Sequence, residues 1–184
     1  MAEFTEAVQY VLDREGELSE NPNDPGGITK YGISFRFLKS LPLDKLRSYG
    51  IFVSETITED DIRELTLDQA KSIYKGEFWD HAPFEDLTSQ AIANYIYDMA
   101  VNMGIAPAIK CAQRACWSII NRYASIVDDG ILGTNTIAQI NKAFPSCMLY
   151  AMRSERAGYY RLLVECNPNQ REFLDGWLRR SYGG

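Results

Sequence analysis

The sequence predicts a mainly α-helical protein that forms one compact domain. Apolar residues recur at intervals of three and four along most of the chain, which is the spacing of helices with one buried face. No alternating run of apolar and polar residues is long enough to predict an ordinary strand, although a small hairpin is expected near residues 25–34. No repeat or low-complexity linker divides the 184 residues, a length that suits one domain with a sizeable core.

The first predicted helix ends in a stiff turn. Its apolar face over residues 3–15 is made by Phe4, Ala7, Val8, Val11 and Leu12. Residues 19–27 contain two prolines and two glycines, which do not continue a helix. We therefore expect the helix to end before this segment.

Short helices follow, and their starting signals can be read from the sequence. Residues 34–48 have helical spacing but are interrupted at Pro42. A Thr followed three residues later by an acid or amide is typical of a capping box, in which each side chain bonds the other residue's backbone. Two such pairs precede predicted helices, Thr58 with Asp61 and Thr66 with Gln69.

The second half of the chain is more strongly helical. Helices are predicted over 88–104, 107–125, 134–143, 145–166 and 168–181. The second of these is apolar around most of its circumference, so we expect it to be the central buried helix. The turn at Asp129 and Gly130 could contact a ligand, but we expect it to cap the helix that follows.

Charge and residue counts exclude several classes of protein. The formal net charge is −6 and the basic residues are scattered, which excludes a nucleic-acid partner. No apolar run approaches eighteen residues, so no membrane insertion is expected. His81 is the single histidine, which argues against a metal site with several histidines and against a catalytic Cys–His pair. We expect no metal and no other cofactor.

The segment least typical of a scaffold, residues 14–34, reads REGELSENPNDPGGITKYGIS. Glu15 comes at the end of the first predicted helix, where the negative end of the helix dipole favours a protonated carboxyl group. Asp24 lies in a polar, proline-flanked turn and is expected to stay ionised, while the hydroxyl of Thr29 could orient a water molecule. Two carboxyl groups whose surroundings give them different pKa values suit cleavage of a glycosidic bond. Surface charge and ordinary turn chemistry would also explain these residues, so spacing alone leaves both readings open.

The same segment resembles the hallmark of glycoside hydrolase family 108, the N-acetylmuramidases, whose pattern is close to E-G-G-Y-x-x-x-P-x-D-x-G-G-x-T-x-Y-G-I. Glu15 falls on the opening Glu, and the later part of the pattern falls on Asp24, Gly26, Gly27, Thr29, Tyr31 and Gly32. IYKGEFWD and YDMAVNMG resemble two further family segments, which contain Trp79, Asp98 and Asn102. VDDGILGTNT and FLDGWLRR resemble the family's C-terminal peptidoglycan-binding region, so the likeness covers most of the chain.

This resemblance implies a lysozyme-like fold and a muramidase that cuts the β-1,4 bond between N-acetylmuramic acid and N-acetylglucosamine. Glu15 would be the general acid, and Asp24 and Thr29 would position water or stabilise charge. The residues that would line the substrate cleft are Tyr31, Trp79, Asp98 and Asn102. Trp79 would equally fit core packing, and Asp98 with Asn102 a buried structural hydrogen bond.

The resemblance also implies how the chain is organised and where it acts. Residues 1–105 would be the catalytic part and 106–184 a helical peptidoglycan-binding part of one domain. Peptidoglycan glycan strands would be the partner of a monomer. The first residues lack a basic leader and a continuous apolar core, so we expect synthesis in the cytoplasm without a signal peptide. Action in the periplasm or cell wall would follow release through a holin or a dedicated machine, as for a phage or prophage endolysin or a secreted effector.

One departure from the family pattern keeps an alternative open. Glu17 and Leu18 stand where the family has Gly and Tyr, which adds a rival acid two residues from Glu15. Residues i and i+2 do not share a helix face, so we expect Glu17 to be an electrostatic neighbour. A non-catalytic wall-binding or adaptor protein is the main alternative, whereas an amidase or cysteine peptidase is disfavoured by the single histidine.

Overall fold

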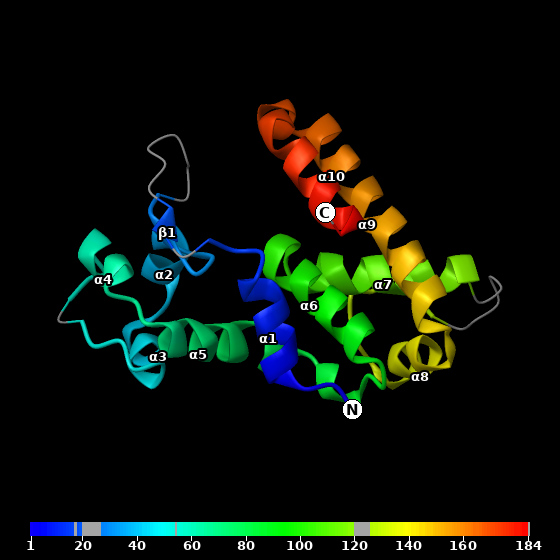
Figure 1. The fold of residues 1–184 in the computed structure, drawn as a ribbon, viewed down its shortest axis with the longest axis horizontal. Helices are drawn as coiled ribbons and strands as arrows, with labels where there is room; N and C mark the ends of the chain where they lie inside the picture. The colour runs from blue at the N-terminus through cyan, green and yellow to red at the C-terminus, as the bar shows by residue number, and fades with distance from the viewer. Residues whose placement is uncertain (17, 20–26, 54, 120–125, 184) are drawn as a thin grey trace. The chain divides into compact units, whose positions relative to one another are not determined.

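Helices make up most of the chain (Figure 1). The computed structural model describes residues 1–16, 18–19, 27–53, 55–119 and 126–183. Its α-helices are α1 (Phe4–Leu12), α2 (Phe35–Ser40), α3 (Leu43–Ser48), α4 (Glu59–Arg63), α5 (Leu67–Glu77), α6 (Gln90–Met103), α7 (Ile105–Ile119), α8 (Thr134–Lys142), α9 (Pro145–Cys166) and α10 (Leu174–Tyr182). The described residues also include the short 3₁₀ segments η1 (Trp79–His81), η2 (Phe84–Asp86) and η3 (Pro168–Phe173). The prediction of a mainly α fold is confirmed.

The chain forms two compact units. Val8–Asp80 is one, here called the hairpin unit, and Met1–Ala7 with His81–Gly184 is the other, here called the helical unit. The predicted organisation, one domain with a catalytic part over 1–105 and a wall-binding part over 106–184, stays a prediction.

A small sheet gives the hairpin unit its name. Strands β1 (Leu18–Ser19), β2 (Thr29–Lys30) and β3 (Ile33–Ser34) pair antiparallel in that order. Lys30 pairs with Ile33, so Tyr31 and Gly32 form a two-residue turn with φ of 52° and 78°. Positive φ at both central residues is the requirement of a type I′ hairpin turn. The hairpin expected near residues 25–34 is confirmed over 29–34, and residues 25 and 26 lie outside the described part of the chain.

The helix-start signals in the hairpin unit act as predicted. The side chain of Thr66 accepts from the backbone N–H of Gln69 at 3.3 Å, and the Gln69 amide accepts from the backbone of Thr66 at 2.9 Å. The backbone N–H of Thr58 donates to the Asp61 carboxylate at 2.7 Å in the same way. Pro42 separates α2 from α3, because its ring removes a backbone donor. Local capping therefore sets where these short helices begin and end.

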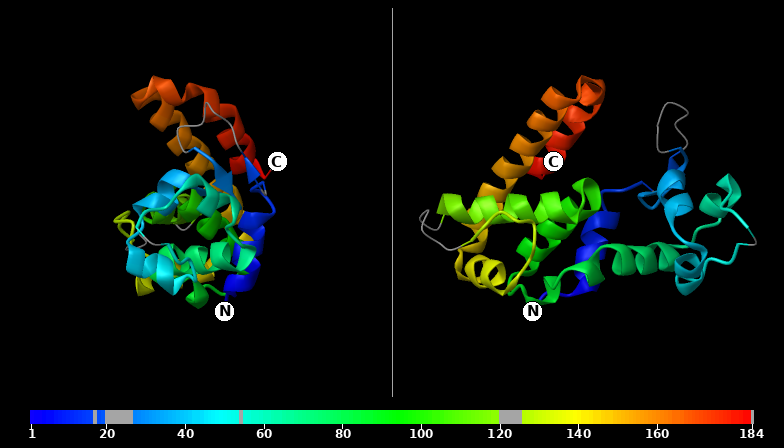
Figure 2. Two further views of the ribbon diagram at one scale, coloured as in Figure 1. Left: turned by 90° about the vertical axis from the view of Figure 1, so that its left-hand side faces the viewer. Right: turned by 180° about the vertical axis from the view of Figure 1, so that it is seen from behind.

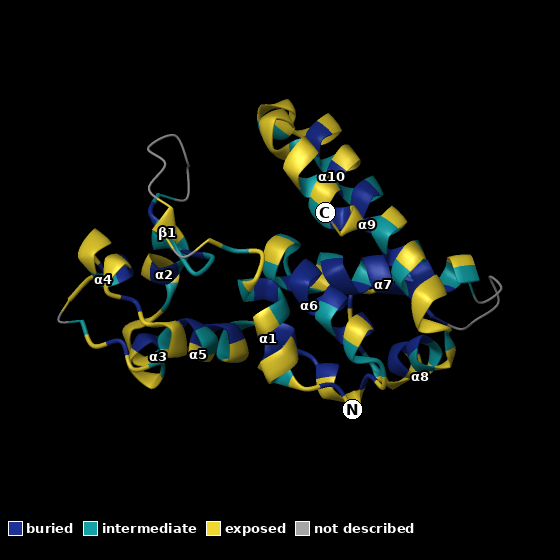
Figure 3. Ribbon diagram, in the orientation of Figure 1, coloured by how far each residue is buried: buried dark blue, intermediate teal, exposed yellow. Residues whose placement is uncertain are grey.

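The core of the helical unit is built on α6, whose residues Tyr95–Ala100 are all buried. Helix α7 packs against both α6 and α9, and the chain reverses at η3 so that α10 lies along α9 (Figure 2). The sequence predicts residues 107–125 as the central buried helix. Helix α7 has a buried face, but α6 is more completely buried (Figure 3). Residues 120–125 lie outside the description.

The last predicted helix, 168–181, does not begin as an α-helix. Residues Pro168–Phe173 form η3, in which Gln170 donates to the carbonyl of Asn167 at 3.0 Å. Bonds of this i to i+3 type wind the chain more tightly than an α-helix. Helix α10 starts only at Leu174, so the prediction is wrong in its first turn and a half.

A buried carboxylate joins three helices of the helical unit. Asp98 of α6 is 1% exposed. Its carboxylate forms ion pairs with Arg156 of α9 at 2.6 Å and with Arg180 of α10 at 2.7 Å. The Arg156 guanidinium is itself fully buried and lies 5.4 Å from the centre of the Tyr95 ring. Burial alone would raise the pKa of Asp98, but the hydrogen bond from Arg180 and the charges of both arginines hold it below 3.8.

Replacing Asp98 should destabilise the protein strongly. We expect Asp98→Asn to lower the free energy of unfolding by about 3–5 kcal/mol, because two arginines lose their shared anion in a buried site. Asp60→Asn is the matched control, since Asp60 pairs with Arg63 at 2.8 Å but is 83% exposed. Its expected cost is below about 1 kcal/mol. Chemical denaturation of both variants measures the difference, and equal small losses would contradict the importance of the buried pair.

The contribution of Asp98 should also vanish in acid. Its pKa is lowered in the folded state, so its stabilisation is fully present above the ordinary value of 3.8 and is lost as the pH falls through the lower folded pKa. The stability difference between wild type and Asp98→Asn should therefore stay constant between about pH 5 and 7 and shrink below about pH 4. Denaturation midpoints across this range measure it. A difference that grows on acidification would contradict the assigned direction.

Candidate active site

Glu15 lies in a tight turn just after α1. The backbone N–H of Arg14 donates to the carbonyl of Val11 at 2.9 Å, and that of Glu15 donates to Leu12 at 3.2 Å. These i to i−3 bonds end the helix at Leu12, three residues before the predicted end. The side chain of Glu15 is half-buried. Glu15 is thus held by a turn at the end of a helix rather than within the helix itself.

The β2–β3 turn packs directly against Glu15. A Cβ atom built on Gly32 would lie 2.8 Å from Cγ of Glu15 and would overlap the hydroxyl of Tyr74. Such separations are shorter than real carbon contacts, and φ of 78° is also unfavourable for any side chain. Because Gly32 has no side chain, its backbone can lie directly against the side chain of Glu15.

Tyr74 anchors this turn to α5. Its ring is 1% exposed and its hydroxyl donates to the carbonyl of Tyr31 at 2.9 Å. The Tyr74 ring centre lies 6.1 Å from that of Phe78, which in turn lies 6.0 Å from Phe37 of α2. Aromatic packing around the buried ring of Tyr74 thus holds the turn that contacts Glu15.

The other predicted residues of this unit differ in exposure. Thr29 is half-buried on β2, opposite Ser19 and Ser34. Tyr31 is half-buried, and the ammonium group of Lys30 lies 5.5 Å from its ring centre. Trp79 opens η1 and is 6% exposed, which matches the core-packing alternative. Asp24 and Glu17 lie outside the described residues.

Asp98 and Asn102 lie one turn apart on α6, in the helical unit. Asp98 is buried in its ion pairs with Arg156 and Arg180, which is the structural one of the two alternatives that the sequence leaves open. Asn102 is exposed, and its side-chain oxygen accepts a hydrogen bond from the Tyr160 hydroxyl. A substrate contact by either residue stays a prediction.

Sequence reasoning misses the partners of these two residues. Arg156 and Tyr160 come from α9 and Arg180 from α10, which are 58 and 82 residues away along the chain. Asp98 and Arg180 each lie in a segment that resembles the family, but neither segment shows that the two residues would meet. A basic residue within an otherwise apolar helix face is the one available signal, and it does not name the acid that Arg156 would meet.

The described residues contain neither a metal-binding cluster nor a helix suited to a membrane. No three histidine, cysteine, aspartate or glutamate residues among them are grouped so that they could hold a metal ion. None of the described helices combines the length and the apolar character needed to cross a membrane.

A half-buried carboxyl group packed on a hairpin turn is an arrangement suited to acid catalysis by a glycoside hydrolase. The family model described as glycosyl hydrolase 108 matches residues 8–104, just over half of the chain. A second model, described as a predicted peptidoglycan domain, matches residues 107–182. The chain belongs to the glycosyl hydrolase 108 family, and the two matches together make it a peptidoglycan-related glycosyl hydrolase.

A solved structure shares the fold. It is titled structure of Brucella abortus SagA, and it superposes with a TM-score of 0.70 at 23% sequence identity over 97% of this chain and 89% of that one. No curated protein sequence matches the chain.

The contact between Gly32 and Glu15 predicts a selective effect of mutation. Gly32→Ala adds both backbone strain and a clash, whereas Gly50→Ala adds the strain alone, since Gly50 has φ of 76° and open space around its Cβ position. We expect Gly50→Ala to cost about 1 kcal/mol and Gly32→Ala about 1–3 kcal/mol more. Chemical denaturation gives both values.

Wall hydrolysis should separate the same two variants. Gly32→Ala should lose most activity because its new methyl group displaces Glu15, while Gly50→Ala should keep it. Equal activity in the two variants would show that the position of Glu15 does not depend on the turn.

Proposed function

We propose that the protein is an N-acetylmuramidase that hydrolyses the β-1,4 bond between N-acetylmuramic acid and N-acetylglucosamine in peptidoglycan. The supporting observation is the packing of Glu15 against the Gly32 turn, in a chain whose family is glycosyl hydrolase 108. The match of residues 107–182 to a predicted peptidoglycan domain supports the choice of substrate.

In the proposed reaction Glu15 is the general acid. It donates its proton to the glycosidic oxygen as the bond to the sugar carbon breaks, so the leaving sugar departs as a neutral alcohol. Asp24 and Thr29 stabilise the positive charge that develops on the remaining sugar ring, or position the water that attacks it. This chemistry uses carboxyl groups and water and requires no cofactor.

The remaining predicted residues support the substrate in different ways. Tyr31 follows Thr29 on the hairpin, so its ring is proposed to face the sugar chain near the acid. Trp79 is buried and is proposed to shape the substrate site through its packing in the hairpin unit. Asn102 is exposed and is proposed to contact the glycan, while Asp98 acts through the fold of α6. We propose a monomer that acts on the wall or in the periplasm.

Digestion of purified peptidoglycan by wild type, Glu15→Gln and Glu17→Gln tests this proposal. Loss of the proton donor should lower the rate by about 10²–10⁴-fold in Glu15→Gln. Glu17→Gln should retain cleavage, because Glu17 is proposed to be a neighbour and not the acid. Mass analysis of the fragments should find new reducing ends on N-acetylmuramic acid, and thermal unfolding of each variant should confirm an unchanged fold.

Other outcomes would point to other functions. Tight binding to the wall without cleavage by the wild type would support a non-catalytic wall-binding protein. Loss of activity in Glu17→Gln instead of Glu15→Gln would move the acid role by two residues. Inhibition by a metal chelator or a thiol-alkylating agent would support an amidase or a cysteine peptidase.

A further inference from the structure

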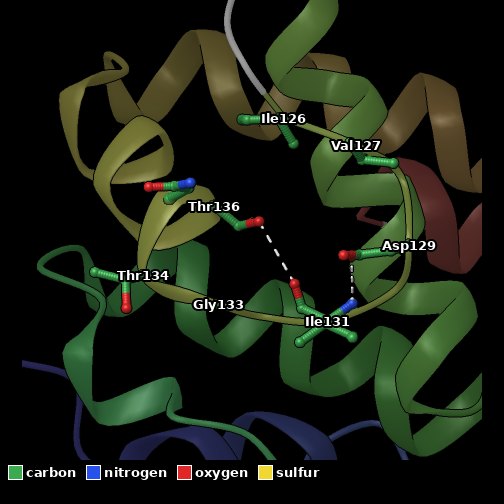
Figure 4. Close-up of a pocket in the computed structure, with 8 residues that line it drawn as sticks. Ile126, Val127, Asp129, Ile131, Gly133, Thr134 and Thr136 are labelled. Carbon is green, nitrogen blue, oxygen red and sulfur yellow. Dashed lines mark hydrogen bonds between the residues drawn. The ribbon is translucent and has the colours of Figure 1, made fainter.

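A pocket of about 350 Å³ lies in the helical unit between the end of α7 and the start of α8 (Figure 4). It belongs to the part of the chain that matches the predicted peptidoglycan domain, whereas Glu15 belongs to the hairpin unit. The lining residues that the structure describes come from one segment and are Ile126, Val127, Asp129, Ile131, Gly133, Thr134, Asn135 and Thr136.

Buried hydrogen bonds preform this pocket. Gln113 of α7 is 1% exposed, and its amide nitrogen donates to the carboxylate of Asp129 at 2.8 Å and to the carbonyl of Ile131 at 3.1 Å. Its amide oxygen accepts from the backbone of Gly130 at 3.0 Å. Gly130 has φ of 79°, and a Cβ there would lie 3.0 Å from the carbonyl oxygen of Ala106. The buried side chain of Gln113 thus holds Asp129, Gly130 and Ile131 in place along the pocket.

The turn in this segment does not cap the helix that follows. The expectation that Asp129 and Gly130 cap residues 134–143 is wrong, because Gly133 is the N-cap of α8 and receives no side-chain cap bond. The Asp129 carboxylate instead accepts from the backbone N–H of Ile131 at 2.9 Å. The bonds from Gln113 and Ile131 both reach the same oxygen of Asp129, Oδ1. Because Asp129 is exposed, its carboxylate is also accessible to a ligand.

The lining combines exposed aliphatic side chains with one anion. Val127 is 69% and Ile131 is 65% exposed, although burial of either would be favourable by about 1.5–3 kcal/mol. The hydrogen bond from Gln113, with that from Ile131, lowers the pKa of Asp129, so its carboxylate is ionised at neutral pH. Asp128 beside it is already paired with Arg114 at 2.8 Å. The positive charge of Lys110 likewise lowers the pKa of Asp129, so the pocket presents an exposed carboxylate beside two aliphatic groups.

This chemistry suits a short peptide better than a sugar. Among the lining residues that the structure describes none is aromatic, so these residues offer no flat surface on which sugar rings stack. An amino group would be attracted to Asp129, and side-chain methyl groups would cover Val127 and Ile131. In peptidoglycan, the stem peptides carry both kinds of group, whereas the glycan strand carries no primary amine when it is N-acetylated.

We propose that this pocket binds the stem peptide of peptidoglycan, with Asp129 accepting a peptide amino group and Val127 and Ile131 contacting its side-chain methyl groups. The inference deepens the proposed function, and it rests on that function for the choice of peptidoglycan as the target. It adds a second contact with the wall that does not involve the glycosidic bond.

Calorimetric titration with a free tetrapeptide of L-Ala, D-Glu, diaminopimelate and D-Ala tests the site on the full-length protein. The probe has no glycosidic bond, so binding is measured apart from hydrolysis. Asp129→Asn and Ile131→Ser should each weaken binding by about tenfold or more, because they remove the charge or the apolar contact. Acetylation of the peptide amines should weaken binding to the wild type by a similar factor.

Matched controls exist on α9. Leu162→Ser removes a side chain that is 65% exposed, as Ile131 is, and Glu165→Gln removes an exposed acid. Neither should change peptide affinity. Thermal unfolding of all four variants shows whether any loss of binding comes from unfolding.

The two proposals can fail separately. Peptide binding that depends on Asp129 and Ile131, without wall cleavage by the wild type, would overturn the muramidase and support the pocket. Wall cleavage with no measurable binding of the tetrapeptide to the wild type would overturn the pocket and leave the muramidase in place. Equal affinity of wild type and both pocket variants would likewise overturn the assignment of this site.

Discussion

The carboxylate of Asp98 is the point at which α6, α9 and α10 are joined, and the helical unit depends on it. Two arginines donate to it at 2.6 and 2.7 Å, and it is 1% exposed. Removal of these charges from water is costly, so the cluster is favourable only because each partner is present. The Tyr95 and Tyr160 rings near Arg156 add cation–π attraction to a guanidinium group that has no contact with solvent.

This cluster also relates the two regions that the family models recognise. Asp98 and Asn102 fall in the part matched by glycosyl hydrolase 108, while Arg156, Tyr160 and Arg180 fall in the part matched by the predicted peptidoglycan domain. Hydrogen bonds run from the second set to the first, and Asp98, Arg156 and Tyr160 are buried whereas Asn102 is exposed. The two sequence regions therefore share one core in the helical unit, in which arginines of the second region pair with the Asp98 carboxylate of the first.

In the hairpin unit the backbone, more than the side chains, sets the position of the candidate acid. A type I′ turn needs positive φ at two residues. This backbone conformation is strained at Tyr31, which has a side chain, but not at Gly32, which has none. The turn then lies against Glu15 because Gly32 lacks a side chain, and Tyr74 holds it there through the Tyr31 carbonyl. The proposed catalysis and the proposed peptide binding thus use preformed features of separate units, in line with cutting one part of the wall polymer and holding another.

The sequence by itself determined the elements whose causes are local. Capping pairs such as Thr66 with Gln69, the interruption at Pro42 and the hairpin turn each depend on residues within four positions, so their outcome could be predicted without knowing the fold. The family motif likewise identified Glu15 as the candidate acid. The tertiary structure alone decided that α6 would be the most buried helix, that Asp98 would meet Arg156 and Arg180, and that Gln113 would shape a pocket. Local propensity acts over a few residues, whereas the burial of a charge depends on which distant helices pack around it.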